Sequence, residues 1–230
     1  MIRVTTCLDY FTEPELLKWI ENNSKAKRKA IQEEALRIGS IVDLLIQLDI
    51  KQNDQPKPII LDNDKVKVEN CMRAWETFKM DYPSFVPGVM EMQTELNNGE
   101  IMGHPDFIHI NGITDLKCSS GIRPRYWTQV SEYFNLRFKN SHVWGNGFIA
   151  VLRLDKVSGL YEYRKIEDQS YIDYEISIFN AYHLAFNHNE INREIIRQQL
   201  EKEILECSTK SPYSERREAA SRQSDFLTQE

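Results

Sequence analysis

The sequence predicts a mixed α/β or α+β protein in which helices flank a central mixed β-sheet. Two observations support this prediction. Apolar residues recur at helical spacing before Val89, whereas short alternating segments separated by Asn and Gly turns begin there. A helical segment then separates these strands from a second pair of strand segments, and a long helical pattern follows. The order is therefore helices, strands, helix, strands, helix.

Three helical patterns precede the strands. The first has Thr12 as a candidate N-cap and Pro14 in its first turn. The second continues from about Arg28 to Ile46, and the polar, proline-bearing residues 52–58 predict a loop after it. The third is an amphipathic helix expected over residues 69–79.

The next segments predict a three-stranded antiparallel meander. We expect strands at residues 89–96, 101–110 and 113–118. Asn97-Asn98-Gly99 and Asn111-Gly112 are the turn signals between them. Alternate residues of a strand share a face, so polar side chains on these strands can gather on one side of the sheet.

The remaining residues predict a helix at about 124–138, a hairpin formed by residues 147–154 and 159–166, and a long helix over about 171–206. We expect one domain over residues 1–207, since 230 residues suit a single sizeable core. Residues 208–230 are polar and are expected to form a flexible tail.

Composition excludes several classes of protein. The chain is 41% hydrophobic and 28% charged, as soluble globular proteins are. No stretch approaches the roughly 20 apolar residues of a membrane span, and the N-terminus has no secretory signal. The four cysteines stand singly, so we expect reduced thiols in the cytoplasm. The net charge of −6 counts weakly against nucleic-acid binding, because a whole-chain sum says nothing of one face.

Three carboxylates and a lysine fall on the predicted meander. Asp115 and Lys117 are two residues apart and share a face, while Asp106 and Glu95 lie on the preceding strands. Two or three carboxylates suffice to hold Mg²⁺, which prefers oxygen ligands and retains several waters. Such ions lower the pKa of water and clamp a transferring phosphate, and a neighbouring lysine can orient the attacking water.

These residues carry a family resemblance. Gly103-His104-Pro105-Asp106 followed by Asp115-Leu116-Lys117 resembles the signature of the PD-(D/E)XK nuclease superfamily. The wider order resembles its RecB-like and phage exonuclease branch. In that branch a helical Gly-x-x-x-His motif comes first, then a glutamate, then the two acidic strands, and finally a Gln-x-x-x-Tyr helix. The matching segments here are Gly39 to Asp43, Glu95, and Gln129 to Tyr133. Asp43 departs from the family by replacing its histidine.

The resemblance implies a restriction-endonuclease-like fold and a DNA exonuclease that uses Mg²⁺ or Mn²⁺. It implies that Lys117 positions the water and that Gln129 and Tyr133 support the site. The metal ligands implied are Glu95, Asp106, Asp115, the carbonyl of Leu116, and Asp43. It further implies a bacterial or phage-infected cell and a role in recombination, repair or phage DNA processing, with a homo-oligomer or a recombination partner protein as candidate assemblies. Cys207 stands alone near the C-terminus, so no iron–sulfur cluster is expected.

Several assignments stay open at the level of sequence. Glu91 shares the alternating face of Glu95 and is an alternative upstream acid. Asp43 is either a ligand or an ordinary helix residue, and His104 more simply shapes a turn than binds metal. Gln129 and Tyr133 are either site residues or a helix-packing pair. The loop after the lysine is either a phosphate-gripping segment or plain surface; its polar residues are Ser119, Ser120, Arg123 and Arg125.

Other function classes compete with the exonuclease. One alternative is a non-catalytic nucleic-acid-binding module on the same fold, although repelling acids held together would be costly without a use. Another is a structure-specific endonuclease. A nucleotide phosphohydrolase would call for helical His-Asp pairs, and none of the five histidines has such neighbours. The sequence thus favours a metal-dependent nuclease over these classes.

Overall fold

The computed structural model describes residues 1–9, 19–52 and 56–209, apart from the side chains of residues 196, 197 and 200–209. Two sequence predictions lie outside these residues: the N-cap at Thr12 with Pro14, and the polar tail beyond residue 209. The elements are β1 (Ile2–Arg3), α1 (Val4–Asp9), α3 (Lys25–Lys51), α4 (Asp62–Asp81), α5 (Phe85–Gly88), β2 (Val89–Met92), β3 (Leu96–Asn97), β4 (Ile101–Gly103), β5 (Phe107–His109), β6 (Gly112–Lys117), α6 (Pro124–Phe138), β7 (Phe148–Leu154), β8 (Tyr161–Ile166) and α7 (Gln169–Thr209).

A five-stranded mixed sheet forms the centre of the fold, with strand order β2-β5-β6-β7-β8. Strands β6 and β7 pair in parallel, and the other neighbours pair antiparallel. Parallel neighbours need a crossover, which helix α6 supplies between them. This β6-α6-β7 unit places the strand that carries Asp115 in the middle of the sheet.

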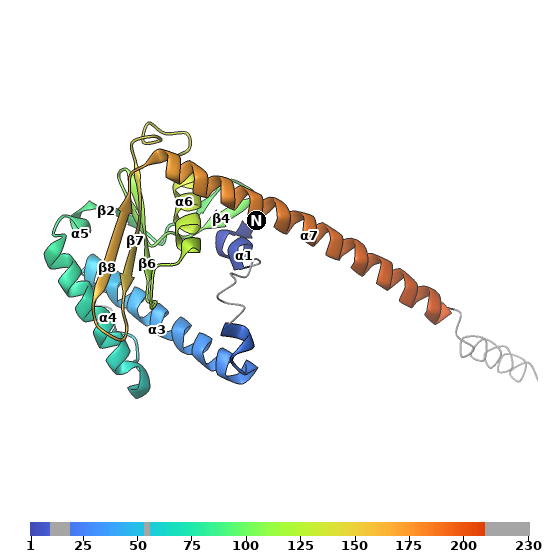
Figure 1. Cartoon of the computed structure of the whole chain (residues 1–230), viewed down its shortest axis with the longest axis horizontal. Helices are drawn as coiled ribbons and strands as arrows, with labels where there is room; N and C mark the ends of the chain where they lie inside the picture. The colour runs from blue at the N-terminus through green and yellow to red at the C-terminus, as the bar shows by residue number, and fades with distance from the viewer. Residues whose placement is uncertain (10–18, 53–55, 210–230) are drawn as a thin grey trace, which may run out of the picture. The chain divides into compact units, whose positions relative to one another are not determined.

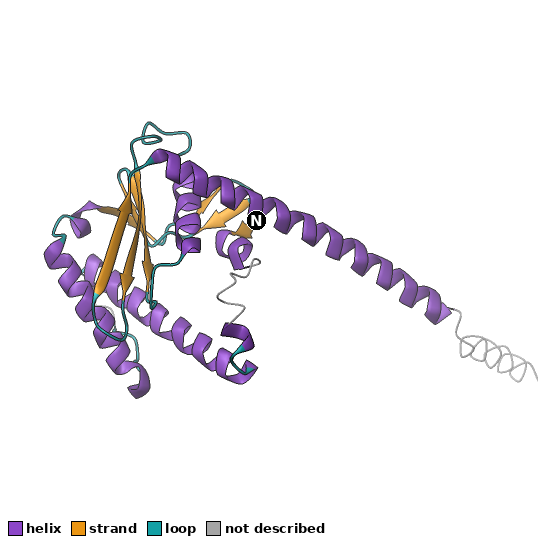
Figure 2. Ribbon diagram, viewed as in Figure 1, coloured by secondary structure: helices purple, strands orange, loops and turns teal. Residues whose placement is uncertain are grey.

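Helices cover both faces of the central sheet. Helix α6 packs on β6 and β7, while α4 packs on β7 and β8 and α3 packs on α4. Figure 1 shows α4 and α5 on one side of the sheet and α6 on the other, and Figure 2 shows the same layers by element type. The predicted mixed α/β class, with helices flanking a mixed sheet, is confirmed.

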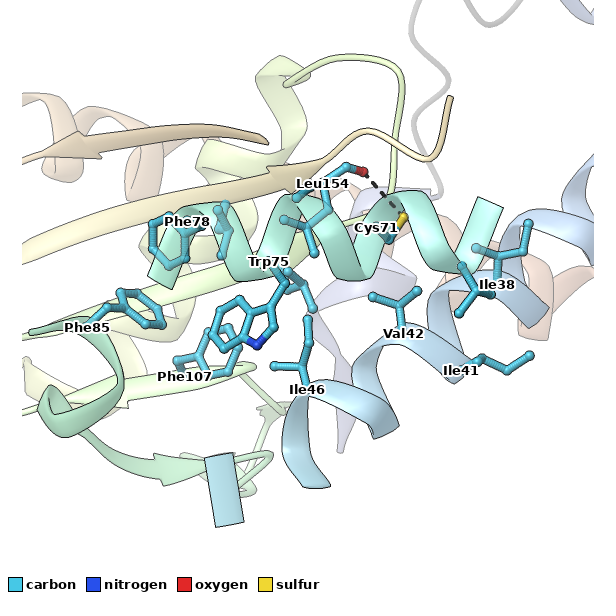
Figure 3. Close-up of a cluster of buried hydrophobic side chains, with 14 residues drawn as sticks. Ile38, Ile41, Val42, Ile46, Cys71, Trp75, Phe78, Phe85, Phe107 and Leu154 are labelled. Carbon is cyan, nitrogen blue, oxygen red and sulfur yellow. Dashed lines mark hydrogen bonds between the residues drawn. The ribbon is translucent and has the colours of Figure 1, made fainter. Parts of the chain in front are cut away.

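The main core lies between α3, α4 and one face of the sheet (Figure 3). Trp75 and Phe78 stand three residues apart on α4, as an inward helical face requires, and both are fully buried. Trp75 stacks on Phe107 of β5 with a centroid separation of 6.3 Å. Leu116 of β6 belongs to the same cluster. Its neighbours Asp115 and Lys117 therefore face the opposite side, toward α6.

The predicted meander is wrong in its sheet assignment. The expected strand 89–96 divides into β2 and β3, and the expected strand 101–110 divides into β4 and β5. Strands β3 and β4 belong to a separate sheet of order β1-β4-β3. The first break falls at Gln93, whose φ of 53° reverses the chain, and the second falls at Pro105, which has no N–H for a ladder.

The contacts divide the chain into two compact units. The first comprises Met1–His183 and contains both sheets. The second begins at Leu184, within α7, and its exposed apolar side chains include Leu184, Ile191 and Ile195. None of the helices in the described ranges is long and apolar enough to cross a membrane.

Candidate active site

Strand β6 presents an aspartate and a lysine on the face covered by α6. Asp115 is 2% exposed, and Lys117 Nζ lies 2.5 Å from its Oδ2 atom. The ammonium also lies 5.2 Å from the ring centroid of Tyr126, at the start of α6. The two atoms form a buried ion pair, and Asp115 Oδ2 itself is inaccessible to solvent.

Asp106 lies immediately before β5 and is fixed by two donors. Its Oδ2 accepts the backbone N–H of Leu116 at 2.6 Å, and its Oδ1 accepts Nε2 of Gln93 at 2.7 Å. The pairing of β5 with β6 ends at Thr114, so the edge of β6 beyond it is free to meet the Asp106 side chain. The N–H and C=O of one strand residue point to the same edge, and the Leu116 carbonyl therefore faces the Asp106 side as well.

Asp43 reaches the same place from helix α3. Its Oδ2 accepts Nε2 of Gln47, one helical turn later, at 3.0 Å. Gln93 Nε2 lies 3.3 Å from Asp43 Oδ1, so one amide contacts the carboxylates of Asp43 and Asp106 together. The structure thus brings Asp43, whose role the sequence left open, next to Asp106.

Helix α6 contributes a linked pair. Nε2 of Gln129 donates to the hydroxyl of Tyr133 at 2.9 Å, as their spacing of one turn allows. The Tyr133 ring lies directly against Gly103 of β4: a Cβ atom there would sit 2.2 Å from Tyr133 Cε1. Only glycine permits this approach of ring to strand. The absence of a side chain at Gly103 thus allows Tyr133 to pack at this position.

These side chains line one cavity of about 490 Å³. It lies between β1, α1, α3, β4, β6 and α6. Of the sequence-predicted site residues it includes Asp43, Asp106, Asp115, Leu116, Lys117, Gln129 and Tyr133. Residues as distant in the sequence as Arg3 and Tyr133 thus meet at one concave site, which is the usual form of a small-ligand or catalytic site.

Burial and like charge dominate the electrostatics. Burial, and then the neighbouring Asp115 and Asp43 carboxylates, raise the pKa of Asp106 well above its ordinary value. Burial opposes the charge of Lys117, but the Asp115 and Asp106 carboxylates outweigh it and raise the pKa of the ammonium. Burial is also the main cause of the raised pKa values of Asp43 and Tyr133. The cavity is therefore a place where positive charge is strongly favoured.

A divalent cation of the kind implied by the resemblance fits the chemistry of these donors. The buried Oδ2 of Asp115, the oxygens of Asp106 and the Leu116 carbonyl are hard ligands suited to Mg²⁺ or Mn²⁺. Across residues 1–9, 19–52 and 56–209, no three His, Cys, Asp or Glu side chains are grouped closely enough to hold an ion between them. Two carboxylates, a backbone carbonyl and waters suffice for Mg²⁺.

The structure does not bring Glu95 to the cavity, which differs from the sequence prediction. Its side chain is 45% exposed, with Oε1 accepting Asn97 Nδ2 at 3.0 Å and Oε2 lying 3.7 Å from His104 Nε2. The alternative acid Glu91 pairs with Arg137 instead and also lies outside the cavity lining. The positive φ of Gln93 explains this, because it interrupts the strand alternation that would have aimed Glu95 inward.

The four predicted phosphate-contacting residues also lie outside the cavity lining. Ser119 Oγ donates to the carbonyl of Gly121, and Arg125 forms an exposed ion pair with Asp9 at 3.2 Å. Ser120 and Arg123 are exposed on the loop between β6 and α6. A contact between this loop and a phosphate stays a prediction.

Sequence reasoning gave no role to three residues at or beside the cavity. Arg3 and Thr5 line it from β1 and α1, where no local motif points to a site. Gln93 does not line the cavity but contacts Asp43 and Asp106, which do. Its proximity to two aspartates could not be read from the pattern, because it depends on a single backbone reversal.

No family model and no curated protein matches this chain significantly. Among solved structures, the chain is similar to an alkaline exonuclease, LHK-Exo from Laribacter hongkongensis, with 13% identity and a TM-score of 0.38. The match covers 86% of this chain and 94% of the exonuclease. LHK-Exo in complex with dAMP matches over the same shares at 13% identity and a TM-score of 0.36. At these TM-scores the likeness does not assign a function.

Proposed function

We propose that this chain is a Mg²⁺- or Mn²⁺-dependent nuclease of the PD-(D/E)XK type that hydrolyses DNA phosphodiester bonds. One observation carries the proposal: a single cavity holds Asp106, the Asp115–Lys117 ion pair and the Leu116 backbone between them. The order of these groups along the chain is the one that resembles the nuclease signature.

The site residues have distinct roles in this proposal. Asp106 and Asp115, with the Leu116 carbonyl, hold the cation, and Asp43 adds charge from α3. When bound, the cation neutralises a phosphate and lowers the pKa of a nearby water. In this proposal the Lys117 ammonium, which the Asp115 and Asp106 carboxylates stabilise in the metal-free protein by raising its pKa, orients the attacking water and offsets developing negative charge.

Helix α6 supports the lysine in this scheme. Tyr126 lies beside the Lys117 ammonium, and the Gln129–Tyr133 pair closes the cavity wall next to it. A protonated tyrosine hydroxyl is favoured here, because burial raises the pKa of Tyr133 above its ordinary value. Tyr133 is thus available to donate a hydrogen bond to a phosphate oxygen at every pH near neutrality.

We propose exonuclease action, in recombination, repair or phage DNA processing, on the strength of the ordered sequence resemblance. The test is cleavage of an end-labelled linear duplex, a circular plasmid, a single strand and an RNA of the same sequence. Each is incubated with Mg²⁺, Mn²⁺ or EDTA, beside Asp115→Ala. We expect metal-dependent loss of linear DNA with the circle intact, and no activity in the variant.

Other results would change the assignment. Cutting of the circular plasmid would make the chain an endonuclease with the same site. Preferential cleavage of the RNA would make RNA, rather than DNA, the substrate. No cleavage by folded protein with either metal would contradict the nuclease and favour a non-catalytic nucleic-acid-binding module.

A further inference from the structure

Gln93 has an unusual backbone conformation. It lies between β2 and β3 with φ at 53°, in the left-handed region that non-glycine residues rarely adopt. Its N–H donates to the carbonyl of Pro105 at 3.1 Å, which ties this turn to the segment that carries Asp106. Such a conformation costs on the order of 1–3 kcal/mol and persists where the surroundings enforce it, often at functional sites.

The backbone reversal aims the Gln93 side chain at two carboxylates. Nε2 lies 2.7 Å from Asp106 Oδ1, 3.3 Å from Asp43 Oδ1 and 3.5 Å from Asp43 Oδ2. Asp43 and Asp106 come from a helix and from a strand entry 63 positions apart, and one amide group links them. An amide has two N–H donors, so it can serve both acids at once.

Glu95, two residues later, takes no part in this arrangement. It contacts Asn97 and His104 and is 45% exposed. The group of the β2–β3 connection that contacts the site acids is therefore the neutral amide of Gln93, not the carboxylate of Glu95. Gln93 is neutral, so the formal charge of the cavity comes from Asp43, Asp106 and Asp115 against Lys117 and Arg3. The sum is −1 when all five are ionised, and this net negative charge favours a cation.

We propose that Gln93 is the positioning residue that holds Asp43 and Asp106 together for a single divalent cation, and that Glu95 is not a ligand. This inference rests on the proposed nuclease function. The residue acts through the two carboxylates, whose separation and rotamers its amide restrains. Partners of metal ligands that act in this way typically contribute about 10–100-fold to metal affinity.

The experiment measures Mn²⁺ binding to full-length protein without DNA, by electron paramagnetic resonance and calorimetry. Gln93→Ala removes the amide, and we expect it to weaken Mn²⁺ binding about 10–100-fold. Gln93→Glu can no longer donate to the acids but supplies an oxygen ligand, so its affinity should equal or exceed that of Gln93→Ala. Glu95→Gln is the matched control and should bind Mn²⁺ within about 2-fold of the wild type, since Glu95 contacts Asn97 and His104 rather than Asp43 or Asp106.

A second variant tests whether weaker Mn²⁺ binding comes from the lost amide contact rather than from misfolding. Gln93→Asn keeps a residue that tolerates a positive φ but shortens the side chain, which withdraws the amide from Asp43 and Asp106. We expect weaker Mn²⁺ binding with an unchanged circular dichroism spectrum. Cleavage by Gln93→Asn should recover when Mn²⁺ is raised, because the defect is in affinity, whereas Asp115→Ala should not recover.

The outcomes separate this inference from the nuclease proposal. If folded Gln93→Asn and Gln93→Ala bind Mn²⁺ like the wild type while Glu95→Gln binds weakly, Glu95 is the ligand and the inference is wrong. The nuclease proposal survives that result. Wild-type protein that binds no Mn²⁺, or binds it equally after Asp115→Ala, contradicts both.

Discussion

Lys117 is held between an aspartate and an aromatic ring on the α6 side of the sheet. Its ammonium is the ion-pair partner of the buried Asp115 carboxylate, which holds it at the cavity. Lys117→Ala should lower kcat by roughly 10²–10³-fold, the usual effect of removing one positioned donor. Single-turnover cleavage under saturating metal measures this.

The same variant should keep its metal site. Mn²⁺ affinity of Lys117→Ala should be equal to or tighter than that of the wild type, because a cation next to Asp115 and Asp106 is removed. Cleavage at a near wild-type rate would remove the lysine from the mechanism.

Glu132 is a buried acid on α6 that makes stability depend on pH. Burial raises its pKa to about 7 from an ordinary 4.5, although Asn135 donates a hydrogen bond to it at 3.0 Å. An acid whose pKa is raised on folding binds its proton more tightly in the folded state. Its contribution is therefore fully present below about pH 4.5 and is lost as pH rises through about 7.

Glu132→Gln should remove this dependence while keeping an acceptor for Asn135. Relative to the wild type, the variant should gain up to roughly 3 kcal/mol of unfolding free energy at pH 8, and much less at pH 5.5. Urea unfolding at the two pH values measures the difference. A gain of equal size at both would show that the charge of Glu132 is not responsible.

At the scale of elements, β4 and α6 meet at the cavity, where Gly103 and Tyr133 both line it. A methyl group on Gly103 would meet the Tyr133 ring at 2.2 Å, and one on Gly112 of β6 would meet the Phe148 ring at 2.4 Å. Overpacking of this kind costs about 1–3 kcal/mol, so Gly103→Ala and Gly112→Ala should destabilise the protein similarly. Only Gly103→Ala displaces a residue of the candidate site.

Comparing Gly103→Ala with Gly112→Ala therefore separates an effect on stability from an effect on cleavage. Measured at a temperature where both variants are folded, cleavage should fall much further in Gly103→Ala than in Gly112→Ala. Equal rates would mean that Tyr133 does not contribute to the reaction. Thermal unfolding of both variants supplies the comparison of stability.

At the scale of the whole molecule, the candidate site and the core belong to the unit Met1–His183. All buried hydrophobic residues among the described side chains lie at or before Phe179. A chain that ends at His183 should therefore fold and bind Mn²⁺ like the full chain. Its unfolding free energy should change by less than about 1 kcal/mol, which is about 2–4 °C in Tm for this size.

Calorimetry and Mn²⁺ titration of the shortened chain check this. Loss of cooperative unfolding would show that residues after 183 complete the core. Retained folding with lost cleavage would instead assign those residues to the handling of DNA.

Much of the fold could be predicted because its signals are local. Helix α6 occupies the predicted residues 124–138, since Pro124 at its start and the apolar period both act within a few residues. The shared face of Asp115 and Lys117 follows from their spacing of two in any strand. The β7–β8 hairpin follows from two alternating segments around one turn. The mixed α/β class follows from the order of these elements.

The sequence by itself thus determined the class of the fold, the limits of α6 and the Asp115–Lys117 pair. Only the tertiary structure decided which upstream residue contacts the cavity acids, because the positive φ at Gln93 breaks the strand alternation that would put Gln93 and Glu95 on the same face. It also decided that β4 leaves the central sheet to pair with β1, since strand pairing depends on which distant backbone supplies hydrogen bonds. The approach of Asp43 to Asp106 depends on the packing of α3, which no spacing along the chain encodes.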